Sequence, residues 1–125
     1  MLAKGEFKVK LEPQHDEEFE AGRLTINKEY SGDMTGTGKG QMLSYRSVVE
    51  GSAGYVAIEK VNATLEGKNG SFVLQHSGSM HDGQQSLSVV VVPDSGDGDL
   101  RGIVGDLAII IKEGQHFYEF KYEIA

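Results

Sequence analysis

The chain has 125 residues, the length of one domain, and its composition excludes several kinds of function. It contains no cysteine, which excludes a disulfide framework, a thiolate metal site and a thiol nucleophile. Acidic residues outnumber basic ones by 19 to 12, the formal charge is −7 and the basic residues are scattered, so no nucleic acid is expected as a partner. The N-terminus shows no apolar signal region and no segment has membrane-spanning length, so we expect a cytoplasmic protein with no membrane partner.

Apolar and polar residues alternate with a period of two along most of the chain, as in half-buried strands, and no long stretch keeps helical spacing. The first strand is predicted over residues 3–12, where Phe7, Val9 and Leu11 share one face. Further strands are predicted at 23–31, 37–46, 53–65, 71–80, 85–93, 100–112 and 115–124. The glycine-rich stretch 31–40 is the least strand-like. The acidic run at 16–20 is typical of a solvated loop.

Hairpin turns set the register of neighbouring strands, and three are predicted, at Asn69-Gly70, Asp82-Gly83 and Glu113-Gly114. In all three registers the large apolar side chains share one face, which is the predicted core. With no helix to cover that face, we expect residues 1–125 to form one closed antiparallel meander β-barrel of about eight strands, because closure also removes exposed strand edges. A two-sheet sandwich is the alternative.

Several apolar residues point outward in this register: Val56, Ile58, Val73, Val90, Val92, Ala108, Ile110 and Phe117. A contiguous apolar exterior implies a partner. The simplest such partner is a second copy of the chain, so we expect a homo-oligomer whose subunits pack through the outside of the barrel.

Three motifs resemble known sites but lack parts of them. Residues 36–40 resemble a phosphate-binding loop, yet no Ser or Thr follows the lysine and no helix follows. Residues 94–99 resemble a calcium loop, but Arg101 stands where an oxygen ligand is needed, so a polar turn is expected. The four histidines do not have metal-ligand spacing, since His76 and His81 point to opposite faces. We therefore predict no metal and no cofactor.

A small set of polar residues falls on the apolar face: Tyr55, Glu59, His76, Tyr118, Tyr122 and, at the rim, His116. Burial in an apolar lumen would raise the pKa of Glu59, which suits a general acid or base with His76 as a candidate partner. The predicted register pairs Glu59 with Met80 and leaves His76 four residues away, about 13 Å, so direct contact is not expected. The alternative is that Glu59 is a satisfied interior group, paired with His76 or a tyrosine hydroxyl, or lies in water near a barrel mouth.

Three strings, GSAGYVAIE at 51–59, GSFVLQHSG at 70–78 and VVPDSG at 91–96, resemble an uncharacterised bacterial family known as domain of unknown function 3224. The resemblance covers essentially the whole chain. It implies a small closed meander barrel similar to allene oxide cyclase, and no established activity. In allene oxide cyclases an interior glutamate and polar neighbours act on a fatty-acid-derived epoxide, so Glu59 invites comparison, but a shared fold does not transfer chemistry.

Three functions are open on this reasoning. The first is a binding module whose lumen holds a small, mostly apolar molecule, with polar contacts from Tyr55, Glu59, His76, Tyr118 and Tyr122. The second is a cofactor-independent isomerase, cyclase or lyase in which Glu59 or His76 moves a proton. The third is a structural oligomeric protein with a filled barrel and no site. A lumen without a cavity would exclude the first two.

Overall fold

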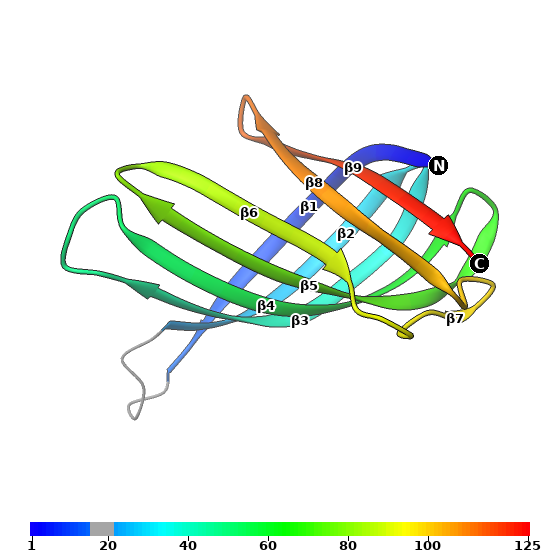
Figure 1. The fold of residues 1–125 in the computed structure, drawn as a ribbon, viewed down its shortest axis with the longest axis horizontal. Helices are drawn as coiled ribbons and strands as arrows, with labels where there is room; N and C mark the ends of the chain where they lie inside the picture. Colours follow the sequence, from blue (N-terminus) through cyan, green and yellow to red (C-terminus); the bar gives the residue numbers. More distant parts are fainter. Residues whose placement is uncertain (16–21) are drawn as a thin grey trace.

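Eight long antiparallel strands close into a barrel in the computed structural model, which describes residues 1–15 and 22–125 (Figure 1). They are β1 (Leu2–Gln14), β2 (Gly22–Gly32), β3 (Met34–Arg46), β4 (Ala53–Leu65), β5 (Lys68–His81), β6 (Gln84–Val91), β8 (Ile103–Lys112) and β9 (Gln115–Ile124). Neighbours in sequence pair in space, and β9 pairs back with β1. A short extra strand, β7 (Asp97–Gly98), pairs with β5. The predicted closed meander barrel is confirmed, while the acidic run at 16–20 lies outside the described residues.

Two of the three predicted turns are confirmed and one is wrong. Asp82-Gly83 and Glu113-Gly114 join their strands with positive φ at both turn residues, as in type I′ hairpins. The β4–β5 turn lies at Glu66-Gly67 instead of Asn69-Gly70, with φ of 48° and 86°. The correction moves every partner on β5 by six residues, for example from Met80 to Leu74 opposite Glu59. Because six is even, each side chain keeps the predicted face.

Asn69 and Gly70 have the residue types of a turn but serve another purpose in the structure. Both lie inside β5, where they hold the segment between β6 and β8 against the barrel. The Asp99 amide donates to the Asn69 carbonyl at 2.9 Å, and Gly70 pairs with Gly98 of β7. A Cβ at Gly70 would overlap the Asp97 carbonyl and press on Leu100. The glycine is therefore required by close packing and not by a turn.

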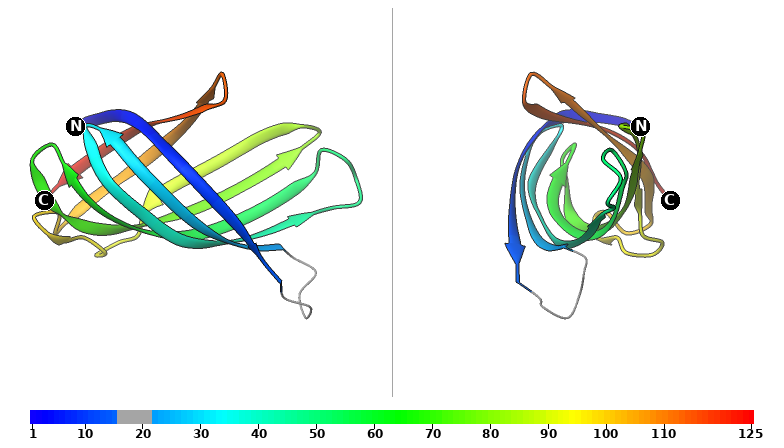
Figure 2. Two further views of the ribbon diagram at one scale, coloured as in Figure 1. Left: turned by 180° about the vertical axis from the view of Figure 1, so that it is seen from behind. Right: turned by 90° about the vertical axis from the view of Figure 1, so that its left-hand side faces the viewer.

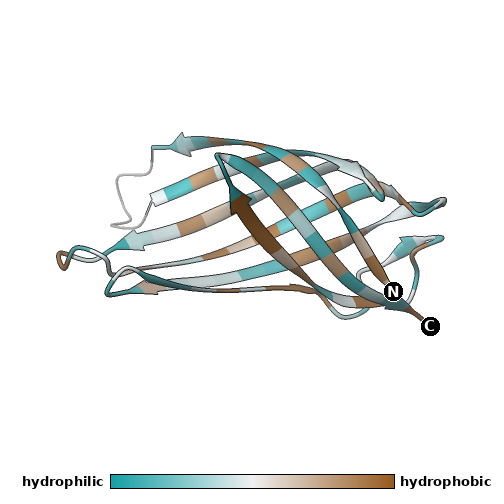
Figure 3. Cartoon of the chain, turned by 90° about the horizontal axis from the view of Figure 1, so that it is seen from above, coloured by the Kyte–Doolittle hydropathy of each residue, from teal (hydrophilic) through white to brown (hydrophobic). Residues whose placement is uncertain are grey.

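Hydropathy alternates along the strands (Figure 3). The buried apolar side chains form the core inside the barrel. One end of the lumen is packed. Phe120 stacks on Phe72 and Tyr122, with ring centroids 5.5 and 5.3 Å apart. Leu100, from the segment between β6 and β8, is fully buried beside Gly70. We call this the closed end.

The opposite end, where β4, β6 and β9 begin, is open. The lumenal residues Leu11, Leu87 and Ile111 there are 45%, 43% and 64% exposed. In the described part of the chain, β6 and β8 pair only at Val90 and Asp106 and then diverge toward this end (Figure 2). The expectation that closure removes strand edges is thus wrong at this seam, because the excursion between β6 and β8 shifts the two strands so that they meet only near the closed end. Within the described residues no helix has the length and hydropathy to cross a membrane.

Candidate functional site

The strand register arranges the lumenal residues of β3 to β6 in rows across the barrel wall. From the open end inward, the rows are Arg46–Ala53–Met80–Gln85, Ser44–Tyr55–Gly78–Leu87, Met42–Ala57–His76–Val89 and Gly40–Glu59–Leu74–Val91. Each row lies two residues, about 7 Å, deeper than the one before it. The first two rows line a pocket, and the next two carry His76 and Glu59.

Glu59 is the centre of a buried polar cluster. Its Oε1 accepts hydrogen bonds from Lys28 Nζ and His76 Nε2, both at 2.9 Å, and its Oε2 accepts one from the Tyr30 hydroxyl. Glu59 is fully buried, and Lys28, Tyr30 and His76 are each at most 6% exposed. Phe7 completes the surroundings, since Lys28 Nζ lies 4.7 Å from its ring centroid. We call Lys28, Tyr30, Glu59 and His76 the glutamate cluster.

A glycine on β3 leaves the space in which side chains from β2, β4 and β5 form the cluster. Lys28 on β2 pairs with Gly38 on β3, which in turn pairs with Val61 on β4. A Cβ at Gly38 would overlap Oε2 of Glu59 and lie 3.0 Å from the Tyr30 ring. Glycine at this lumenal position therefore allows side chains from β2 and β4 to meet over β3. The glycine-rich stretch 31–40, which looks least like a strand in the sequence, contains the end of β2 and the first residues of β3.

The cluster changes the expected ionisation of Glu59. Burial raises the pKa of this carboxyl, but the hydrogen bond from His76, the charge of Lys28 and the hydrogen bond from Tyr30 outweigh burial, and its pKa is lowered. The expectation of a raised pKa is wrong, because it considered the apolar lumen and not these donors. Burial, and then the charge of Glu59, raise the pKa of Tyr30 well above 10.0. An ionised carboxylate only accepts, so Nε2 of His76 carries the proton in this contact.

The expected separation of Glu59 and His76 is also wrong. In the true register His76 is opposite Ala57, two residues from Glu59 on the same face, and their side chains are in contact at 2.9 Å. The error came entirely from the misplaced β4–β5 turn. The alternative that Glu59 is a satisfied interior group, paired with His76 or a tyrosine hydroxyl, agrees with the structure, in which both contacts occur together with that of Lys28.

Lys28 and Tyr30 are the cluster residues that sequence reasoning missed. The signal was present: Leu24, Ile26, Lys28 and Tyr30 alternate along β2 and so share the lumenal face. A lysine among apolar residues at that spacing indicates a buried cation that needs an acceptor. No described side-chain nitrogen or oxygen that is buried lacks a hydrogen-bond partner, so the cluster is fully satisfied.

The other predicted site residues do not join the cluster. The Tyr118 hydroxyl accepts from the Met34 amide at 2.9 Å and lies within 3.0 Å of the Ser31 and Met34 carbonyls, so it ties β9 to the β2–β3 turn. At the closed end Tyr122 donates to Glu66 Oε1 at 2.6 Å, and burial together with Glu66 raises its pKa to about 12. His116 is half-buried against Phe7, at 5.2 Å between ring centroids.

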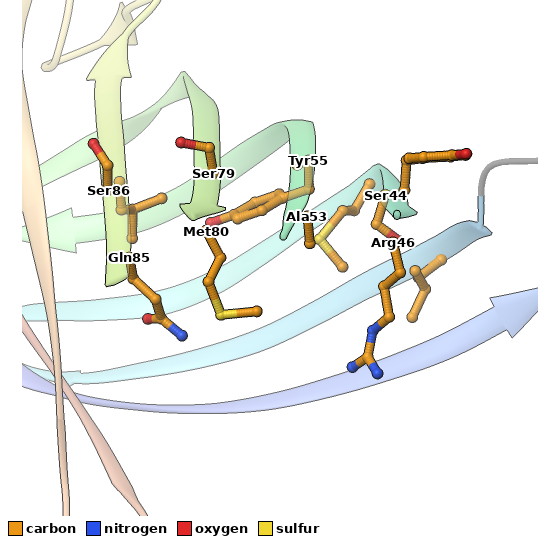
Figure 4. Close-up of a pocket in the computed structure, with 13 residues that line it drawn as sticks. Ser44, Arg46, Ala53, Tyr55, Ser79, Met80, Gln85 and Ser86 are labelled. Atoms are coloured by element: carbon orange, nitrogen blue, oxygen red, sulfur yellow. The ribbon is translucent and has the colours of Figure 1, made fainter. Parts of the chain in front are cut away.

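A pocket of about 410 Å³ occupies the open end of the lumen. Its lumenal wall includes Leu24, Met42, Ser44, Tyr55, Met80 and Leu87. Figure 4 shows Tyr55 reaching from β4 toward Met80, with Met80, Gln85 and Arg46 on the same side of the strands and Ser79 and Ser86 on the other. Tyr55 is thus the one predicted polar residue that lines this pocket. The described residues contain no group of three or more His, Asp or Glu side chains that could hold a metal ion.

Fold and site together define the class of protein: a small eight-stranded meander barrel with a buried lysine–glutamate–histidine–tyrosine cluster below a pocket at its open end. The chain belongs to the family described as "Protein of unknown function (DUF3224)", which matches residues 3–122. It is similar to the crystal structure, at 1.84 Å, of a DUF3224-family protein of unknown function from Shewanella oneidensis MR-1. The two are 45% identical with a TM-score of 0.96, over 100% of this chain and 97% of that one. A comparison with curated proteins found no relative.

Proposed function

We propose that the protein binds a small, mostly apolar molecule in the open end of the barrel. The observation that carries this proposal is the pocket of about 410 Å³ with apolar side chains on its lumenal wall. Such a volume lies within the range of about 300–1,000 Å³ that is typical of small-molecule sites. A barrel with only a structural role is expected to fill its lumen at both ends, as this one does at the closed end.

Exposed apolar surface inside the pocket supplies the driving force. Leu87 points into the lumen and is still 43% exposed, and Leu24, Met42 and Met80 line the same pocket. A ligand that covers these side chains removes their apolar surface from water, which is worth about 25 cal/mol per Å². Two methionines adapt their shape easily, so the pocket suits a ligand that only partly matches its walls.

The glutamate cluster supports the pocket from below in this proposal. Met42 and His76 lie in the same row, so the cluster is the layer on which the pocket rests. The cluster is better suited to supporting the pocket than to proton transfer. Glu59 is fully buried, has a lowered pKa and already accepts hydrogen bonds from three donors. We therefore assign Glu59 and His76 to the base of the binding site and not to a reaction.

The test uses a neutral apolar fluorophore, N-phenyl-1-naphthylamine, titrated against the wild-type protein and two leucine variants. Leu87 and Leu2 are almost equally exposed, at 43% and 44%, but Leu87 faces the lumen and Leu2 the exterior. We expect Leu87→Asp to raise the Kd about tenfold. We expect Leu2→Asp to leave it unchanged. Equal effects of the two variants, or no binding to the wild type, would contradict the proposal.

A further inference from the structure

The ring of Tyr55 forms part of the pocket wall because the residue opposite has no side chain. Tyr55 pairs with Gly78 across β4 and β5. A Cβ at Gly78 would overlap Cε1 of Tyr55 and lie 3.0 and 3.1 Å from its Cδ1 and Cζ, so the ring covers the backbone of Gly78. The half-buried ring also lines the pocket. An aromatic surface is thus held in a fixed place at the side of the pocket, where a second ring can stack on it.

A cation lies one row closer to the mouth of the same pocket. Arg46 follows Ser44, the partner of Tyr55, by two residues on β3, so the rows of Arg46 and Tyr55 are about 7 Å apart. Arg46 lines the pocket together with Met80 and Gln85, and its side chain extends on their side of the strands (Figure 4). A guanidinium binds carboxylate and sulfonate groups through two parallel hydrogen bonds. Met42 lies one row deeper than Tyr55, and Arg46 lies one row closer to the mouth, in the same row as Met80.

We propose that the ligand is a flat aromatic molecule that carries an acidic group. Its ring stacks on Tyr55 among Met42, Met80 and Leu87, and its anion pairs with Arg46 at the rim. This proposal rests on the proposed function and adds the chemical class of the ligand. A neutral aliphatic ligand could pack on the Tyr55 ring but would neither stack on it nor pair with the Arg46 charge.

Two probes with the same ring system separate the contribution of charge from that of apolar contact. 1-Anilinonaphthalene-8-sulfonate carries a sulfonate, and N-phenyl-1-naphthylamine is its neutral counterpart. We expect Arg46→Gln to raise the Kd of the anionic probe by about tenfold and that of the neutral probe by less than about twofold. Arg101→Gln is the matched control, because Arg101 is an exposed arginine near Asp97 in the segment between β6 and β8 and should change neither Kd.

Tyr55 variants test the stacking. Tyr55→Leu should raise the Kd of both probes by about tenfold, whereas Tyr55→Phe, which keeps the ring, should stay within about twofold of the wild type. Equal effects of Arg46→Gln on both probes, or no effect of Tyr55→Leu on either, would overturn the assigned ligand class. If either result occurs while Leu87→Asp still weakens the binding of the neutral probe, the pocket binds ligands of another class. If neither probe binds the wild type, the proposed function itself fails.

Discussion

Lys28 Nζ lies 2.9 Å from Oε1 of Glu59, and the two side chains are 5% and 0% exposed, so this is an ion pair inside the barrel. A buried pair of this kind has a large desolvation cost, which the mutual attraction and additional hydrogen bonds offset. Here the additional hydrogen bonds come from His76 and Tyr30. Removal of one partner leaves the other charge buried without its counterion.

The first prediction concerns this pair. Glu59→Gln should lower the free energy of unfolding by about 3–5 kcal/mol, because it leaves the Lys28 ammonium group buried without an opposite charge. The double variant Lys28→Met/Glu59→Leu replaces both charges with apolar groups and should lose less than Glu59→Gln alone. Urea denaturation at neutral pH measures both. A double variant that loses as much stability as Glu59→Gln, or more, would contradict this prediction.

The pH dependence of stability follows from the lowered pKa of Glu59. Burial raises that pKa, but His76, Lys28 and Tyr30 bring it below its ordinary value of 4.5. The stabilisation by Glu59 is therefore fully present above the unfolded-state pKa and is lost as the pH falls through the lower folded-state pKa. The difference in unfolding free energy between wild type and Glu59→Gln should be constant above about pH 6 and shrink below about pH 4.5. Urea denaturation of both proteins across this pH range measures the difference. A difference that grows as the pH falls would contradict the prediction.

A methyl group at Gly38 should disrupt the cluster. It would overlap the Glu59 carboxylate, so Gly38→Ala should cost about 1–3 kcal/mol and displace the contact with Tyr30. Gly54→Ala is the control, because a Cβ there meets only the Gly78 carbonyl, at 3.8 Å, and should change stability by less than about 0.5 kcal/mol. Thermal or urea unfolding compares the two. Similar stabilities for both variants would mean that the contacts of the Glu59 side chain do not depend on the space at Gly38.

The Tyr118 hydroxyl is predicted to stabilise the fold and not to bind a ligand. Tyr118→Phe leaves the buried Met34 amide without its acceptor and should cost about 1–3 kcal/mol. It should leave the Kd of N-phenyl-1-naphthylamine unchanged. Tyr45→Phe, at a residue 49% exposed, should have no measurable effect on stability. A stable Tyr118→Phe protein with weakened probe binding would place Tyr118 in the binding site instead.

The apolar exterior still predicts a homo-oligomer. Of the predicted outward residues, Val56 and Ile58 are 53% and 52% exposed and line a hollow of about 520 Å³ on the outer wall together with Leu43, whereas Val73 and Val92 are half-buried. We expect light scattering at micromolar concentration to give a mass above that of one chain, and Ile58→Asp to lower it, because the charge would be buried in the interface. Asn62→Asp, an exposed residue further along β4, is the control. A strictly monomeric wild type would rule the oligomer out.

The sequence by itself determined the strands, the face of each side chain and the two hairpins at Asp82-Gly83 and Glu113-Gly114. These are local properties, since alternation assigns faces and turn residues with positive φ fix the hairpins. It also placed Glu59, His76 and Tyr55 in the lumen, and this assignment survived the misplaced turn because the resulting shift was even.

Only the tertiary structure decided which of these residues meet. The contact between Glu59 and His76 depends on the β4–β5 register, which the packing of Leu100 and Asp97 against Gly70 helps to fix. Lys28 and Tyr30 reach Glu59 from a strand that is not adjacent, over the gap that Gly38 leaves in β3. No local pattern specifies such a contact, because it needs the curvature of a closed wall and an absent side chain together. The same closure, tight at one end and split between β6 and β8 at the other, leaves the pocket beside Tyr55.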